Sequence, residues 1–184
     1  MISKQARSSI DYIFTEAARS SLVLQADDAC SIQPMVKGAA VAASMSDTVL
    51  VITCSSFVFR FLTMLRIGDN TETRAYYAQG APAEENFADA LFEAANLCTG
   101  AINRALSRHF PHVGMSTPYS LSGACLSHLE DLRPQDVLSY EITIREAVRL
   151  QATVCLCSYA PIDFSVNRMP TTESATTGEL EFFE

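Results

Sequence analysis

The chain has 184 residues, of which 48% are hydrophobic and 18% are charged, and its formal net charge is −8. These proportions are typical of one globular domain, and a chain of this length buries about 70% of its unfolded surface. The negative charge and the lack of any Lys/Arg-rich run argue against binding to nucleic acid or to an anionic membrane surface.

Localisation and metal binding are constrained by the same sequence. No stretch approaches the roughly 18 consecutive apolar residues of a membrane span, and the first residues lack the apolar core of a signal peptide. We therefore expect a cytoplasmic protein. The six cysteines include no C-x-x-C pair, so we expect them to be small buried side chains in a reducing compartment. His109 and His112 flank Pro111, a pattern that does not indicate a metal site.

The first elements are one helix and two strands. Residues 4–24 place Ile10 and Phe14 on one side of a predicted helix. Residues 39–45 and 48–55 are predicted to form two strands joined by a short Ser-Asp turn.

A second helix is predicted directly after these strands. Ser55 or Ser56 can cap a helix over residues 57–67, whose apolar residues recur at helical spacing. Gly68 is well placed to end this helix, and a polar loop is expected over residues 69–83.

The C-terminal half is predicted to be mostly strands. A strand over residues 116–123 is followed by the turn-rich stretch 127–136. Alternation then predicts a strand with Tyr140 and Ile142 on one face, and a longer strand that continues to Tyr159. These two strands are expected to form an antiparallel hairpin, with both thiols of the C-x-C pair on one face. Together the elements predict an α+β fold, in which long helices pack on one face of a mostly antiparallel sheet.

The longest predicted element is an amphipathic helix over residues 84–108. One side carries an apolar stripe, and the opposite side carries Asp89, Glu93, Asn96, Gly100 and Asn103. Glycine in a helix interior lowers the stability of the helix by about 1 kcal/mol relative to alanine. A glycine on the polar side is therefore best explained if another molecule approaches the helix backbone there. The other interpretation is an ordinary solvated face that tolerates one glycine.

These residues and their surroundings resemble a known signature. Asp89-x-x-x-Glu93-x-x-Asn96, with Gly100 one turn later and Pro118 further on, is similar to the motif of the CheC/CheX chemotaxis phosphatases. The resemblance covers about residues 5–157, although the spacing from Asn96 to Pro118 differs from the family pattern by about one residue.

A short sequence match between two predicted helices indicates which type of family member the chain resembles. Glu16-Ala-Ala-Arg19 in the first helix matches Glu93-Ala-Ala-Asn96 in the long helix. The match predicts an internal repeat with a pseudo-twofold axis, in which only the second copy has the asparagine. The chain therefore resembles single-site CheX more closely than double-site CheC.

The resemblance implies a phosphatase that acts on the aspartyl phosphate of a CheY-like response regulator. Asn96 would orient the attacking water, and Glu93 would pair with a lysine of the partner. Asp89, Gly100 and Asn103 would contact the partner. The chain itself would need no cofactor, because Mg²⁺ would be bound in the partner's receiver domain.

The resemblance also implies a homodimer that pairs through its sheets, and the strands over residues 137–159 are a candidate edge. We expect a CheX-like phosphatase domain over residues 1–160 and an acidic, flexible tail over residues 161–184. Two alternatives stay open: a non-catalytic module of the same fold that binds a receiver or a flagellar-switch partner, and a structural component of a switch complex.

Overall fold

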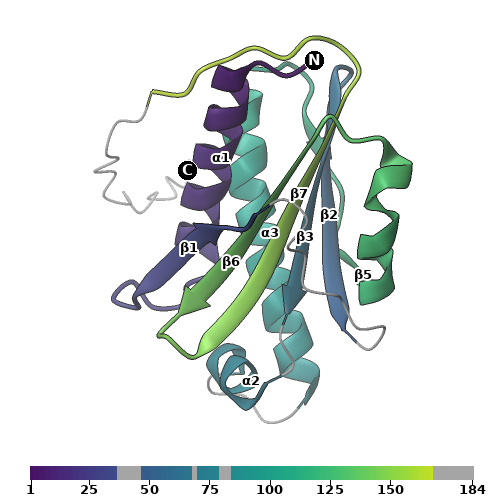
Figure 1. Ribbon diagram of the computed structural model, residues 1–184. Helices are drawn as coiled ribbons and strands as arrows, with labels where there is room; N and C mark the ends of the chain where they lie inside the picture. The colour runs from purple at the N-terminus through teal and green to yellow at the C-terminus, as the bar shows by residue number, and fades with distance from the viewer. Residues whose placement is uncertain (37–46, 68–69, 79–83, 168–184) are drawn as a thin grey trace, which may run out of the picture.

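The computed structural model describes residues 1–36, 47–67, 70–78 and 84–167, without the side chains of residues 84–86. The helices are α1 (Lys4–Ser21), α2 (Thr71–Tyr77), α3 (Glu84–Ser107) and the 3₁₀ helix η1 (Gly123–Leu132). The strands are β1 (Cys30–Pro34), β2 (Thr48–Ser55), β3 (Phe59–Ile67), β4 (Gly114–Met115), β5 (Tyr119–Ser122), β6 (Asp136–Ile144) and β7 (Val148–Ser158). Figure 1 shows α1 and α3 together on one face of the sheet and η1 on the other.

The strands form one antiparallel sheet in the order β1-β6-β7-β3-β2, and β4 and β5 both pair with β2. With β5 placed beside β2, this strand order is symmetric. Exchanging β1 with β5, β2 with β6 and β3 with β7 reverses the order of the strands without changing which strands are neighbours. The middle pair of the β3–β7 ladder is Thr63 opposite Val154, so a pseudo-twofold axis passes near this pair. The two long helices run in opposite directions beside each other, as such an axis requires (Figure 1). This arrangement confirms the predicted α+β fold with its internal repeat.

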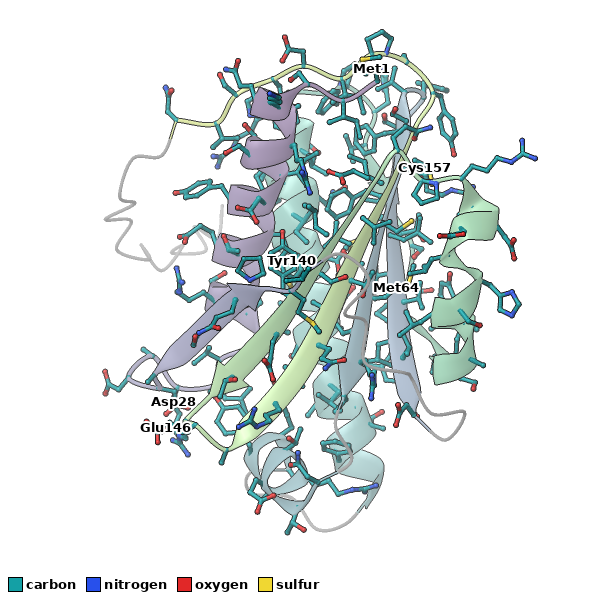
Figure 2. The ribbon with its side chains drawn as sticks, viewed as in Figure 1. Met1, Asp28, Met64, Tyr140, Glu146 and Cys157 are labelled. Atoms are coloured by element: carbon teal, nitrogen blue, oxygen red, sulfur yellow. The ribbon has the colours of Figure 1, made fainter. Side chains whose placement is uncertain are left out.

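The main core lies between the sheet and the two long helices. The β6–β7 hairpin has the predicted facing, with Tyr140 and Ile142 buried on the helix side. Tyr140 stacks on Phe14 of α1 with ring centroids 4.5 Å apart, and its hydroxyl donates to Asp11 Oδ1 at 2.8 Å. Figure 2 shows Tyr140 at this junction between α1 and the sheet. The aromatic pair and its hydrogen bond thus attach α1 to β6.

A second, smaller core lies on the opposite face of the sheet. Cys155 and Cys157 point to this face, as predicted, and pack with residues of β2 and β3 under η1. η1 covers them with three leucines at a spacing of three residues: Leu126, Leu129 and Leu132. A period of three is that of a 3₁₀ helix, and this stretch was predicted only as turns.

The prediction for residues 57–67 was wrong, because they form strand β3 and not a serine-capped helix. Ser56 Oγ accepts a hydrogen bond from Val58 N at 3.2 Å, and Ser56 N donates to Phe59 O at 2.9 Å, which closes a turn between β2 and β3. Helix N-caps use a very similar bond from a serine oxygen to a backbone N–H. Since both faces of β3 are covered, its apolar residues also lack the alternation that marks a half-exposed strand.

Other differences from the prediction are smaller. Residues 71–77 form helix α2 where a loop was expected, and Asn70 Oδ1 caps it by accepting from Thr73 N at 2.7 Å. The short strand β1 was not anticipated. Helix α1 ends at Ser21 instead of residue 24, the strand predicted over 116–123 is reduced to β5, and β4 lies just before it. The strand predicted at 39–45 and the stop at Gly68 lie outside the described residues.

Residues that follow β7 pack on the helices. Ile162 is buried and forms a bridge with Ile2. The Phe164 ring lies 4.8 Å from the His109 ring, centroid to centroid, and 5.2 Å from the Phe110 ring. Ser9 Oγ donates to Phe164 O at 3.3 Å and accepts from Val166 N at 3.1 Å. The packed part of the chain therefore continues beyond residue 160, and the residues expected to form the acidic tail from 168 onward lie outside the description.

The strands proposed as a dimerisation edge are mostly interior. β7 is paired with β6 on one side and β3 on the other, and β6 is paired with β1 over Tyr140–Ile144. Within the described chain, Asp136–Leu138 is the part of this hairpin that has no neighbouring strand on one side. Most of the edge expected from residues 137–159 is thus occupied, and homodimerisation stays a prediction.

A polar network joins the β6–β7 turn to the end of α1 and to α2. Arg145 Nε lies 2.5 Å from Asp28 Oδ1, and Tyr76 OH donates to Asp28 Oδ2 at 2.8 Å. Leu24 N donates to Tyr76 OH at 2.7 Å. Partial burial by itself raises the pKa of Asp28, but hydrogen bonds from Arg145 and Tyr76 and the Arg145 charge outweigh it and lower the pKa below its usual value.

Asp28→Asn is expected to lower the stability of the fold at neutral pH and to reduce its loss on acidification. A carboxyl whose folded-state pKa is depressed stabilises the fold above its unfolded pKa of about 3.9, and this contribution is lost as the pH falls through the folded value. Thermal unfolding between about pH 7 and pH 3 measures both effects. Tyr76→Phe is the companion variant, because it leaves Leu24 N unpaired at a cost of about 1–3 kcal/mol. If wild type and Asp28→Asn lost the same amount of stability as the pH falls, this role would be contradicted.

Candidate functional site

Helix α3 matches the predicted helix over residues 84–108 within one residue, and two elements fix its orientation. It packs over β2 and beside α1. Cys54 Sγ of β2 lies 3.9 Å from Thr99 O of α3. The side that faces this packing carries Leu91, Ala94, Ala95, Cys98, Ile102 and Leu106, all buried. Because the buried side points to the sheet and to α1, the polar stripe is turned away from the core.

The predicted site residues lie along this outward side. Asp89, Glu93 and Asn96 are exposed, and no hydrogen bond or ion pair joins any of the three to another residue that the structure describes. Glu93 and Asn96 are three positions apart, so their side chains are neighbours on the helix surface. The structure thus brings a carboxylate and an amide together on an uncovered helix face.

Gly100 lies one turn beyond Asn96 and has little to pack against. A Cβ atom added at Gly100 would meet one atom within 4 Å outside its immediate helix backbone and chain neighbours, Arg104 Nη1 at 3.5 Å. This is an ordinary van der Waals distance, so the chain's own packing does not require glycine there. Arg104 itself is exposed, and its guanidinium folds back along the helix over Gly100.

Asn103 is less accessible than the other residues of the stripe. Its side chain is half-buried, and its Oδ1 is buried without a hydrogen-bond partner among the described residues. Its backbone carbonyl accepts from Ser107 Oγ at 2.8 Å. The side-chain amide of Asn103 is therefore less accessible to a partner than that of Asn96. The predicted contact between Asn103 and a partner stays a prediction.

The proline of the motif lies on the sheet edge next to α3. Pro118 is half-buried and precedes β5, which pairs with β2. Ser116 fixes this segment, because its N–H donates to Thr53 O at 2.9 Å and its Oγ accepts from Thr53 N at 3.0 Å. The S-x-P segment is thus held against the strand over which α3 packs.

The corresponding place on α1 holds an ion pair. Glu16 and Arg19, which align with Glu93 and Asn96 in the short sequence match, contact each other at 2.9 Å and are about half exposed. Arg19 is occupied by this pair, and a guanidinium cannot accept a hydrogen bond as an amide can. Of the two helices related by the pseudo-twofold axis, α3 is therefore the one with a carboxylate and an amide at these positions.

Two residues of this face were not anticipated from the sequence. Leu97 follows Asn96 and has 53% of its surface exposed, which adds an apolar contact beside the amide. Arg104 is the cation that lies closest to Gly100. The i+4 spacing from Asn96 to Gly100 and from Gly100 to Arg104 was the available signal, since residues four apart share a helix face.

The described residues also include six thiols and several potential metal ligands. In the described part of the chain, no group of three or more His, Cys, Asp or Glu side chains is arranged to hold a metal ion. All six cysteines are free, and burial raises the pKa of Cys54 and Cys98 to about 12, so both stay protonated at neutral pH. Among the described helices, none has the length and hydropathy to cross a bilayer.

Known proteins of similar structure have diverged far in sequence. No family model and no curated protein matches the chain. Its structure is similar to the chemotaxis protein CheX from Vibrio vulnificus, with a TM-score of 0.60 and 16% identity over 80% of this chain and 98% of that one. It is similar to a structure of the CheX-CheY-BeF₃-Mg²⁺ complex from Borrelia burgdorferi, with a TM-score of 0.59 and 12% identity over 80% of this chain and 97% of that one.

A third neighbour is a domain of the protein FliM. The FliM middle domain from Vibrio alginolyticus matches with a TM-score of 0.53 and 12% identity over 83% of this chain and 93% of that one. All three matches cover most of both chains and share the α+β architecture described above. The chain therefore has the fold of the CheC/CheX chemotaxis proteins, which the FliM middle domain shares.

Proposed function

We propose that this chain is a phosphatase that accelerates hydrolysis of the aspartyl phosphate of a CheY-like response regulator. The observation that carries the proposal is the pair Glu93 and Asn96, exposed and three residues apart on the uncovered face of α3. The fold supports it, and so does the neighbouring structure of CheX in complex with CheY. A cytoplasmic location belongs to the proposal, because six free thiols fit a reducing compartment.

In this proposal the reaction needs placement more than covalent help. A water oxygen attacks the phosphorus, the bond from phosphorus to the aspartyl oxygen breaks, and the carboxylate of the receiver leaves. Inorganic phosphate forms, and the proton lost by the attacking water goes to the phosphate or to solvent. Asn96 would hold the water in line through its amide, which has no useful pKa and acts by geometry. Glu93 would bind a lysine of the receiver and fix the register of the helix. Mg²⁺ would be bound by the receiver.

The test is phosphate release from a CheY-like receiver that has been phosphorylated with a small phosphodonor. Addition of the chain is expected to speed the release of phosphate in proportion to its concentration, up to saturation. A binding module of the same fold is the second candidate, and the FliM middle-domain neighbour favours it. Complex formation without faster release would support that candidate. Homodimerisation is a further part of the proposal, and sedimentation of a monomer at micromolar concentration would count against it.

Gly100→Ala is expected to stabilise the chain and to weaken its complex with the receiver. The added methyl group meets Arg104 Nη1 at an ordinary contact distance, so the helix gains about 0.5–1 kcal/mol of propensity without a clash. The same methyl group would occupy space that the partner needs. Thermal unfolding measures the gain in stability, and titration with the receiver measures the loss of affinity. Gly100→Leu should weaken the complex further, and tight binding by Gly100→Leu would show that the glycine serves no partner.

A further inference from the structure

The outward face of α3 has opposite charges at its two ends. Asp89 and Glu93 lie on the N-terminal side of Asn96, and Arg104 lies on the C-terminal side. Eleven residues separate Glu93 from Arg104, which is about 16 Å along a helix at 1.5 Å per residue. The amide that is proposed to enter the receiver therefore lies between a negative and a positive group.

The conformation of Arg104 brings its charge close to the amide. Helix side chains lean toward the N-terminus of the helix, and Arg104 Nη1 lies 3.5 Å from the position of a Cβ atom on Gly100. Gly100 lies four residues after Asn96, about 6 Å along the axis. A guanidinium at this level lies about one turn from Asn96, on the same face.

The small size of residue 100 leaves this position open. A Cβ atom there would contact Arg104 Nη1 at 3.5 Å without a clash, but a side chain longer than that of alanine would take the space into which the guanidinium folds. In the described residues no salt bridge engages Arg104, in contrast to Arg19 on α1, which is paired with Glu16. The guanidinium is thus charged, solvated and near the amide.

We propose, on the basis of the phosphatase function above, that Arg104 is a positioning residue that binds an acidic side chain of the receiver beside its phosphorylation site. Arg104 and Glu93 then contact groups of opposite charge on either side of the inserted amide. A planar guanidinium can bind a carboxylate through two parallel hydrogen bonds, which fixes direction as well as position. A receiver docked in the reverse direction would place like charges together on both sides, so the charge pair selects one orientation.

A structural role for Arg104 makes a different prediction. A cation in the last turn of a helix interacts favourably with the helix dipole, so Arg104 could act on stability alone. Lysine would preserve this effect, and a loss of stability would leave the apparent affinity for the receiver unchanged below the unfolding temperature. Steady-state KM is therefore the readout that separates the two roles.

The experiment compares kcat and KM for phosphate release by wild type, Arg104→Glu, Arg104→Gln and Arg104→Lys, each at low and at high salt. Arg149→Glu is the control for charge and exposure, because Arg149 is exposed and lies on the opposite face of the sheet; within the described chain it has, unlike Arg104, an ion pair, with Glu141 at 3.3 Å. Arg104→Glu is expected to raise KM about 10-fold or more with kcat within about twofold, and Arg104→Gln to raise it less. Arg104→Lys should recover part of the affinity, because lysine restores the charge but not the two parallel hydrogen bonds. The KM of wild type should rise more steeply with salt than that of Arg104→Glu.

Equal KM values for Arg104→Glu and Arg149→Glu would overturn the inference while wild-type activity stands. If wild type fails to speed phosphate release, the phosphatase proposal fails by itself, and the same variants are then titrated with a receiver loaded with beryllofluoride. The same order of affinities would support Arg104 as a docking residue of a binding module. Absence of a complex with wild type would overturn both proposals.

Discussion

Asn96→Ala is expected to lower the acceleration of phosphate release by about 100-fold or more in kcat and to leave KM for the receiver nearly unchanged. The amide would orient the water only while the water attacks, so its loss removes an interaction that belongs to the transition state. Asn96 is exposed and has no hydrogen bond within the described chain, so the free energy of unfolding should change by less than about 0.5 kcal/mol. Release of phosphate in single-turnover and steady-state assays measures the effect.

Three further variants show whether geometry is the cause. Asn96→Gln carries the same amide one methylene further out, and a misplacement of about 1 Å should cost about 100-fold. Asn96→Asp is isosteric but brings a negative charge toward the phosphoryl group, and should also be inactive. Asn103→Ala is the control on the same helix: its Oδ1 is buried, so a contact with the partner would affect KM while kcat should match wild type. Activity retained in Asn96→Ala would remove the amide from the mechanism.

Local signals in the sequence predicted the elements that have one covered face. α3 shows a helical apolar stripe, and β6 and the first part of β7 alternate, because in these segments one side meets the core and the other is more exposed. The alternation of β7 ends near Cys155, where η1 covers its second face. β3 gave no such signal, since helices cover one of its faces and η1 covers the other. Periodicity measures a difference between two faces, and a strand that is buried on both has none.

The turn before β3 was a second source of error. Ser56 accepts a hydrogen bond from the N–H of Val58, and a serine that caps a helix does nearly the same. Local chemistry could not separate these cases, and pairing of β3 with both β2 and β7 decided between them. The pairing of β3 with β7 joins residues about ninety positions apart, which a short window of sequence does not contain.

The candidate site was predictable as a line of residues but not as a charged surface. Spacing placed Glu93, Asn96 and Gly100 on one helix face, and the structure has them there. The position of the Arg104 guanidinium over Gly100 depends on the side-chain rotamer, which no sequence pattern specifies. Asn103 shows the reverse, because its position on the stripe suggested exposure while neighbouring packing half-buries it.

Glu93→Lys is expected to weaken docking to the receiver by about 100-fold or more, with a smaller loss of about 10-fold for Glu93→Gln. In the proposed complex the carboxylate binds a lysine of the receiver, so the neutral variant loses an attraction, and the lysine variant adds a repulsion between like charges. The loss should appear in KM and in the dissociation constant for a receiver loaded with beryllofluoride. Stability should be nearly unchanged, because Glu93 is exposed and makes no ion pair within the described chain.

Asp89 provides the matched control for this charge, because it is an exposed carboxylate one turn earlier on the same face. Asp89→Lys changes the net charge by the same amount as Glu93→Lys, yet it should weaken docking only about twofold to threefold, because Asp89 would lie at the periphery of the contact, where salt screens its charge. If the two lysine variants bind the receiver equally, then the helix face attracts its partner by charge in general, and no specific pair at Glu93 sets its register. A large effect confined to Glu93→Lys, and persisting at high salt, would instead identify a close contact, since partly buried ion pairs are screened much less than exposed ones.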